Sequence, residues 1–119
     1  MRKFIAHQNK RFGNAFRGFC FAYTCDFNFK TQVWSGVLFL GFGYLMYPLT
    51  ETESLFLVLA YALILITELQ NTSFETALDR IHPGHHSDIG ASKDIAAAAV
   101  LMAGSFAVIV VLTILFRRI

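Results

Sequence analysis

Carboxylates interrupt an apolar stretch that is otherwise suited to crossing a membrane. Residues 54–67 are almost entirely apolar, yet the helical pattern continues without a break through Glu68, Asn71, Glu75 and Asp79. At about 100° per residue, these four side chains fall within an arc of roughly 80° and rise about 16 Å along one helix. Ionisable groups at membrane depth face a bundle interior or a wet cavity, because lipid offers them no partner. These four residues, here called the acidic stripe, therefore predict a polar cavity inside a membrane protein.

The composition agrees with a membrane protein. The 119 residues are 55% hydrophobic and have a mean hydropathy of +0.53, which is more apolar than an ordinary soluble domain of this size. We therefore predict a single all-α integral membrane domain over residues 1–119, and we expect no nucleic-acid partner.

Four helical segments are predicted. Residues 1–30 combine recurring phenylalanines with basic residues at a spacing of seven, which is typical of an amphipathic helix lying in the headgroup plane. Three transmembrane helices are expected after this N-terminal surface helix, at residues 31–50, 53–82 and 88–117.

The distribution of charge predicts the orientation in the membrane. Six basic residues precede the first span, whereas the turn at residues 50–53 is acidic and has no Lys or Arg. The positive-inside rule then places the N-terminus and the second connection, residues 82–90, in the cytoplasm of a multi-pass inner (plasma) membrane protein. Arg117 and Arg118 would end outside, which is a mild departure from that rule.

The acidic stripe has the groups that magnesium-dependent phosphoryl transfer needs. Mg²⁺ prefers a few carboxylates completed by phosphate oxygens and water, and the reaction needs a hydroxyl held in line and relieved of its proton. Glu68 lies deepest in the apolar segment, which makes it a candidate general base, and Glu75 is a candidate metal ligand. Lys93 would meet phosphate oxygens as a point charge, with Asp94 beside it and Asp26 as an upstream acid.

Other interpretations of these residues stay open at this point. Carboxylates on a membrane helix also serve as an ion pathway or as polar contacts in an oligomer. The alternative function is thus a non-catalytic oligomeric membrane protein or an ion pathway, which predicts no thermal stabilisation by ATP. His82, His85 and His86 have a helical spacing that suits zinc, but Pro83 and Gly84 break the helix, so solvated loop residues are expected.

The order of the polar residues resembles the signature of the prokaryotic diacylglycerol kinase family, which includes the undecaprenol kinases. The matching string is Glu68-x-x-Asn71-Thr72-x-x-Glu75-x-x-x-Asp79, followed after a gap by Lys93-Asp94-x-Ala96-Ala97-Ala98-Ala99-Val100-Leu101. The resemblance extends over nearly the whole chain. It implies an ATP- and Mg²⁺-dependent kinase of a membrane lipid, either diacylglycerol or undecaprenol, that works as a homotrimer with sites at subunit interfaces.

The same resemblance implies roles for individual residues. Glu68 matches the catalytic base, Glu75 a metal ligand, and Asp26 falls where the family carries a second metal-binding glutamate, so its carboxylate is one methylene shorter. Asn71 and Asp79 are expected to support the active site. The expected nucleotide contacts are His7, Asn14, Asp26, Glu75, Gly84, His85, His86, Lys93 and Asp94. The expected lipid contacts are Glu68, Lys10 and Arg17. His7 stands where some members have an arginine, with Lys10 or Arg11 as its substitute.

Overall fold

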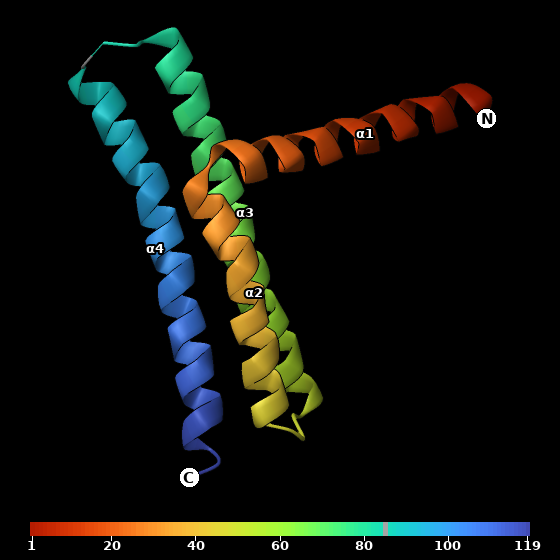
Figure 1. The fold of residues 1–119 in the computed structure, drawn as a ribbon, viewed down its shortest axis with the longest axis vertical. Coiled ribbons are helices and arrows are strands. Elements are labelled where there is room, and N and C mark those ends of the chain that lie inside the picture. Colours follow the sequence, from red (N-terminus) through yellow and green to blue (C-terminus); the bar gives the residue numbers. More distant parts are fainter. Residues whose placement is uncertain (85) are drawn as a thin grey trace.

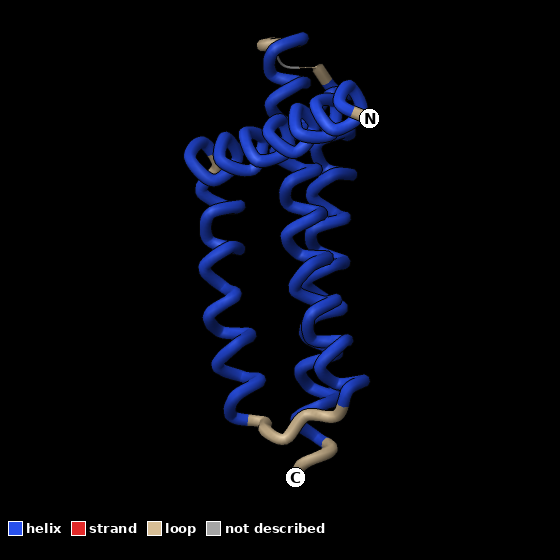
Figure 2. The backbone as a smooth tube through the Cα atoms, turned by 90° about the vertical axis from the view of Figure 1, so that its right-hand side faces the viewer, coloured by secondary structure: helices blue, strands red, loops and turns tan. Residues whose placement is uncertain are grey.

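Four helices make up the part of the chain that the computed structural model describes, which is residues 1–84 and 86–119, with the side chains of residues 2–6 excepted. They are α1 (Arg2–Cys25), α2 (Phe27–Leu45), α3 (Glu51–Ile81) and α4 (Ser87–Phe116). Helices α2, α3 and α4 form a shaft, and α1 projects from its side (Figure 1). The α2–α3 loop lies at one end of the shaft with the C-terminus, and the α3–α4 connection lies at the other (Figure 2). The expected all-helical architecture is confirmed.

The elbow between α1 and α2 lies at Asp26 rather than at residues 30–31, where the sequence placed it. The Asp26 N–H closes α1 by donating to the Ala22 carbonyl at 2.9 Å. Its Oδ1 then accepts from the backbone N–H groups of Asn28 at 2.8 Å and Phe29 at 3.4 Å. Aspartate is among the best N-cap residues because it satisfies N–H groups that have no partner inside the helix. Asp26 therefore ends α1 through its backbone N–H and begins α2 through its side chain.

Helix α3 begins two residues earlier than predicted because a capping box forms ahead of it. Thr50 Oγ1 accepts from the Glu53 N–H at 3.2 Å, and Glu53 Oε2 accepts from the Thr50 N–H at 2.8 Å. These reciprocal bonds fix the helix start at Glu51. The helix ends at Ile81, since the following Pro83 disfavours helical backbone at His82.

The core of the shaft is the seam between α3 and α4. Buried Leu57, Ala60 and Ile64 of α3 pack with small and β-branched side chains of α4, which are Ala103, Ala107, Val110 and Ile114. Small residues at such a seam let two helix backbones approach closely. The seam fixes which face of α3 is turned inward, and that face continues into the acidic stripe.

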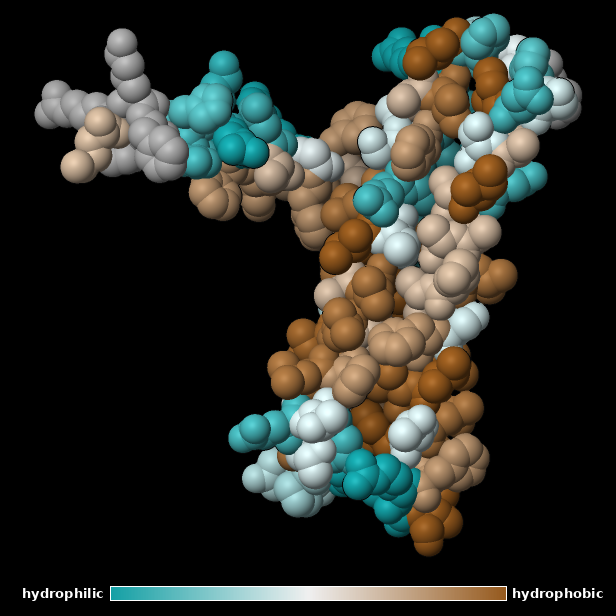
Figure 3. Space-filling model, turned by 180° about the vertical axis from the view of Figure 1, so that it is seen from behind, coloured by the Kyte–Doolittle hydropathy of each residue, from teal (hydrophilic) through white to brown (hydrophobic). Residues whose placement is uncertain are grey.

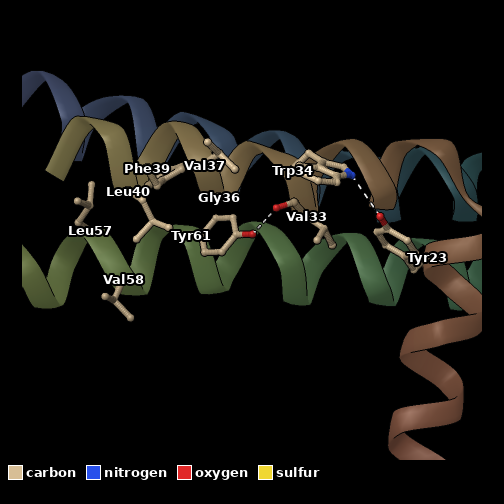
Figure 4. A pocket seen from close by; sticks show the side chains of 10 residues that line it. All are labelled: Tyr23, Val33, Trp34, Gly36, Val37, Phe39, Leu40, Leu57, Val58 and Tyr61. Atoms are coloured by element: carbon tan, nitrogen blue, oxygen red, sulfur yellow. Dashed lines mark hydrogen bonds between the residues drawn. The ribbon is translucent and has the colours of Figure 1, made fainter. Parts of the chain in front are cut away.

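Helix α2 contacts α3 through a tyrosine that fits over a glycine. The Tyr61 hydroxyl donates to the Val33 carbonyl at 2.9 Å, and a Cβ at Gly36 would lie 2.5 Å from that hydroxyl oxygen. The Trp34 indole donates to the Tyr23 hydroxyl at 3.2 Å, which ties α2 to α1 (Figure 4). These residues border a cavity of about 520 Å³ with mainly apolar walls and no carboxylate among its lining residues.

The surface of the shaft is apolar between two polar ends. On the face seen in Figure 3, hydrophobic residues cover its middle and hydrophilic residues gather toward both ends. Helices α3 and α4 are long and apolar enough to cross a membrane, and only 28% and 22% of their most apolar stretches are buried within the chain. Helix α2 does not reach that apolarity, because Asn28, Lys30 and Gln32 occupy its first turns. A third span at α2 therefore stays a prediction.

The two C-terminal arginines are paired with an acid at the end of the shaft farthest from α1. Arg118 Nη2 donates to Glu53 Oε2 and to the Pro48 carbonyl, each at 3.0 Å, and its Nη1 donates to the Met46 carbonyl. Arg117 Nη1 lies 3.7 Å from Glu53 Oε1. Glu53 thus neutralises part of the positive charge of the two arginines at this end of the shaft.

Candidate active site

The elbow is attached to the acidic stripe by Thr72. The Thr72 hydroxyl donates to Asp26 Oδ2 and lies 2.9 Å from the carbonyl oxygen of Glu68, one turn back on α3. Thr72 is only 7% exposed. The contact brings a carboxylate from the N-terminal part of the chain onto the polar face of α3.

Glu68 and Asn71 border a cavity between α2, α3 and α4. They are 3% and 6% exposed, and the cavity of about 310 Å³ is also lined by Asn28 and Gln32 of α2 and by Ala97 of α4. Asn71 Nδ2 donates to Glu75 Oε1 at 3.4 Å, whereas Asn71 Oδ1 is buried and has no hydrogen-bond partner among the described residues. A buried carbonyl oxygen of this kind is an acceptor that a water, an ion or a ligand can satisfy.

Three carboxylates border a second cavity on the other side of the elbow. Its volume is about 220 Å³, and its lining includes Asp26, Thr72, Glu75 and Asp79. Phe27 lines both cavities, so they adjoin at the start of α2. Asp26 and Glu75 lie within electrostatic reach of Glu68. The structure therefore brings together Asp26, Glu68 and Glu75, the acids for which sequence analysis predicted metal binding and proton transfer.

The donor atoms at this place fit Mg²⁺. In the described residues, no three His, Cys, Asp or Glu side chains form a group that could hold a metal by themselves. Magnesium rarely uses such a cage, since one or two carboxylates suffice when phosphate oxygens and water supply the other ligands. The carboxylates of Asp26 and Glu75 border one cavity, and the unsatisfied Oδ1 of Asn71 adds a third hard oxygen nearby.

The residues expected to contact nucleotide from α4 lie at the same end of the shaft. Lys93 Nζ is 2.5 Å from Asp79 Oδ1, so the pair joins α3 to α4. Asp94 is exposed. His86 begins α4, and its Nδ1 accepts from the Asp88 N–H at 3.3 Å. Gly84 is exposed in the connection, and His85 lies outside the described residues.

The residues expected on α1 do not reach the acidic stripe of their own chain. His7, Lys10, Asn14 and Arg17 are all exposed on α1, which leads away from the shaft (Figure 1). Arg17 Nη2 donates to Asn14 Oδ1 at 2.5 Å. Because a helix rises about 1.5 Å per residue, His7 lies about 28 Å along α1 from the elbow.

Several residues that line the two cavities were not singled out from the sequence, Thr72, Asn28 and Gln32 among them. Thr72 was part of the quoted motif but received no role, and Asn28 and Gln32 sit at the start of α2. Asn28 and Gln32 are four residues apart and therefore share one helix face. This polar pair at the start of an apolar helix could have indicated from the sequence that they line a polar cavity. It was missed because the predicted boundary at residues 30–31 put Asn28 and Gln32 in different segments.

Comparison with known proteins gives a consistent result. The family model described as prokaryotic diacylglycerol kinase matches residues 13–115. A curated protein of Synechocystis sp. named diacylglycerol kinase is 33% identical over 100 residues, which are 83% of this chain and 57% of that relative. The chain thus spans little more than half the length of this relative.

Proposed function

The chain belongs to the prokaryotic diacylglycerol kinase family, and on that premise we propose that it transfers the γ-phosphoryl group of ATP to the hydroxyl of a membrane lipid. Membership implies a lipid kinase and a helical membrane protein at the level of the family. The choice between diacylglycerol and undecaprenol is part of the proposal. The observation that carries it is the contact between Asp26 and Thr72, which gathers Asp26, Glu68 and Glu75 at adjoining cavities.

Glu68 is the proposed general base. It takes the proton of the lipid hydroxyl as that oxygen bonds to the γ-phosphorus, and the bond from this phosphorus to the β–γ bridging oxygen breaks, which releases ADP. Its burial beside the cavity of α2, α3 and α4 keeps bulk water from competing for the phosphoryl group. Asn71, fixed by its bond to Glu75, supports this position.

Asp26 and Glu75 are the proposed ligands of Mg²⁺. When bound, the metal neutralises charge on the phosphate oxygens. When nucleotide binds, Lys93 would leave Asp79 and contact a phosphate oxygen. Its positive charge would then lie at this end of the shaft both with and without nucleotide. The remaining proposed nucleotide contacts are His7, Asn14, Gly84, His85, His86 and Asp94, and the proposed lipid contacts besides Glu68 are Lys10 and Arg17.

A homotrimer in the inner membrane completes the proposal, with the N-terminus in the cytoplasm. His7 lies about 28 Å along α1 from the elbow, and Lys10, Asn14 and Arg17 are also exposed on α1. In an assembly, α1 of one subunit can reach the stripe of its neighbour, which gives these residues a site to act on.

Reconstitution into vesicles tests the reaction. Radiolabelled ATP is supplied with diacylglycerol in one sample and undecaprenol in another, and a family kinase of known activity serves as the positive control. We expect label in one of the two lipids, and roughly 10²- to 10⁴-fold slower labelling with Glu68→Gln. If the control labels its lipid while the wild-type protein labels neither, the proposal is wrong.

A further inference from the structure

Asp26 is held by donors from two separate helices. Its Oδ1 accepts two backbone N–H groups at the start of α2, at 2.8 and 3.4 Å, and its Oδ2 accepts the hydroxyl of Thr72 on α3. An ionised carboxylate accepts at about four lone-pair positions. Three of them are engaged within the chain, so one position is left, and its direction is fixed by the other three.

The remaining acceptor position is the one that Asp26 can offer to a ligand in the cavity that it shares with Glu75. Asp26 and Glu75 both line the cavity of about 220 Å³, together with Thr72. Without the Thr72 hydroxyl, Oδ2 of Asp26 would have no hydrogen-bond partner on α3. The carboxylate would then be held only by the two hydrogen bonds that Oδ1 accepts, and Oδ2 could change its position. The distance between the two candidate metal ligands would then vary.

From this geometry we infer that Thr72 is a positioning residue for the metal site. Its hydroxyl orients Asp26 so that the free acceptor position of Asp26 and the carboxylate of Glu75 bind the same Mg²⁺. This inference rests on the proposed function, because it takes Asp26 and Glu75 as the metal ligands. Residues that orient metal ligands typically change metal affinity by about 10- to 100-fold when mutated.

The side chain of Thr72 is itself held in one orientation. Its hydroxyl lies 2.9 Å from the Glu68 carbonyl oxygen, and β-branching restricts the torsion that would swing it away. The same hydroxyl therefore lies between the backbone of the proposed base and the side chain of the proposed metal ligand. Thr72 thus joins the α3 backbone next to Glu68 to Asp26, which lies in the elbow between α1 and α2.

Direct metal binding tests this role without relying on turnover. Mn²⁺ replaces Mg²⁺, and the signal of free Mn²⁺ is followed by electron paramagnetic resonance on the full-length protein with a non-hydrolysable ATP analogue. We expect Thr72→Val to weaken Mn²⁺ binding about 10-fold or more, and Thr72→Ser, which keeps the hydroxyl, to stay within about three-fold of wild type.

Thr67 provides a matched control on the same helix. Its hydroxyl donates to the Leu63 carbonyl at 2.8 Å, so Thr67→Val removes a hydroxyl without touching Asp26, and Mn²⁺ binding should not change. If Thr72→Val binds Mn²⁺ as tightly as Thr67→Val does, the inference is overturned. Should Thr72→Val fail to fold, Thr72→Ala provides the same comparison, because it also lacks the hydroxyl.

The Mg²⁺ dependence of the kinase reaction separates positioning from simple stabilisation. Loss of positioning raises the Mg²⁺ concentration for half-maximal rate about 10-fold, in line with the weaker binding. A merely structural loss lowers the amount of active protein and leaves that concentration unchanged. Wild-type protein that binds Mn²⁺ but phosphorylates neither lipid would refute the lipid kinase and leave the Thr72 inference standing. Wild-type protein that binds no Mn²⁺ would refute both.

Discussion

Glu68 and Glu75 share one helix face but have different surroundings. Glu68 is 3% exposed and lines the cavity between α2, α3 and α4. Glu75 is half-buried, accepts a hydrogen bond from Asn71 and borders the cavity that contains Asp26. The deeper acid therefore suits proton transfer, and the shallower acid suits a hydrated metal.

Substituting each glutamate by glutamine separates these two roles. Glu68→Gln should lower turnover by roughly 10²- to 10⁴-fold, because the general base is lost, while Mg-ATP still binds. Glu75→Gln should weaken Mg-ATP binding instead, because a metal ligand loses its charge. Calorimetric titration with a non-hydrolysable analogue gives the affinities, and single-turnover assays give the rates. Equal loss of binding in both variants would contradict the division.

At the scale of helices, the contact of α2 with α3 depends on the absence of a side chain at Gly36. A Cβ there would lie 2.5 Å from the Tyr61 hydroxyl, which donates to the Val33 carbonyl. The tyrosine cannot keep that bond and accommodate a methyl group, because the contact is far shorter than van der Waals distance.

Gly36→Ala should therefore destabilise the protein by about 1–3 kcal/mol, the usual cost of overpacking. Gly41→Ala on the same helix is the control, since a Cβ there meets nothing within 4 Å. Denaturant titration in detergent measures both. Adding Tyr61→Phe to Gly36→Ala should restore part of the loss, because the closest atom is then absent. Equal stability of the two alanine variants would show that the contact adapts without cost.

The ends of α3 and α4 opposite the elbow are joined through Arg118. Its guanidinium bonds Glu53 and two carbonyl oxygens of the α2–α3 loop, whereas Arg117 only approaches Glu53 at 3.7 Å. Arg118 thus connects the C-terminus to the capping box of α3.

Arg118→Ala should lower the melting temperature by several degrees, because the buried Glu53 and two loop carbonyls lose their donor. Arg117→Ala should have a clearly smaller effect, since its side chain is mostly exposed. Thermal unfolding followed by circular dichroism measures both variants. A larger effect at Arg117 would mean that the hydrogen bonds to the loop contribute little.

For the whole molecule, the topology depends on whether α2 crosses the membrane. Helices α3 and α4 have the required length and apolarity, and α2 begins with polar residues. If α2 crosses, the α2–α3 loop lies on the opposite side of the membrane from α1. If α2 does not cross, the two lie on the same side.

Labelling of single cysteines decides between these arrangements. Cys20 and Cys25 are first replaced by serine, and a cysteine is then placed at Glu51 in one variant and at Asn9 in another. A maleimide reagent that cannot cross membranes should label position 51 in intact cells and position 9 only after the cells are opened, as expected for a cytoplasmic N-terminus. Labelling of both positions from the same side would rule out three spans.

The sequence alone predicted four helical segments and the acidic stripe, because both follow from local patterns. Residues 68, 71, 75 and 79 lie on one face of any helix that contains them, and hydropathy indicates where long helices run. The family followed from the same string of residues, and the match over residues 13–115 confirmed it.

Only the tertiary structure decided which groups from other helices meet that stripe. The bond between Thr72 and Asp26 joins residues 46 positions apart, and it depends on α1 ending at Cys25 and not at residue 30. No local pattern fixes such a contact, because its geometry is set by how α2 and α4 pack against α3. For the same reason, the unsatisfied oxygen of Asn71 and the cavity shared by Asp26 and Glu75 appeared only once the helices were packed.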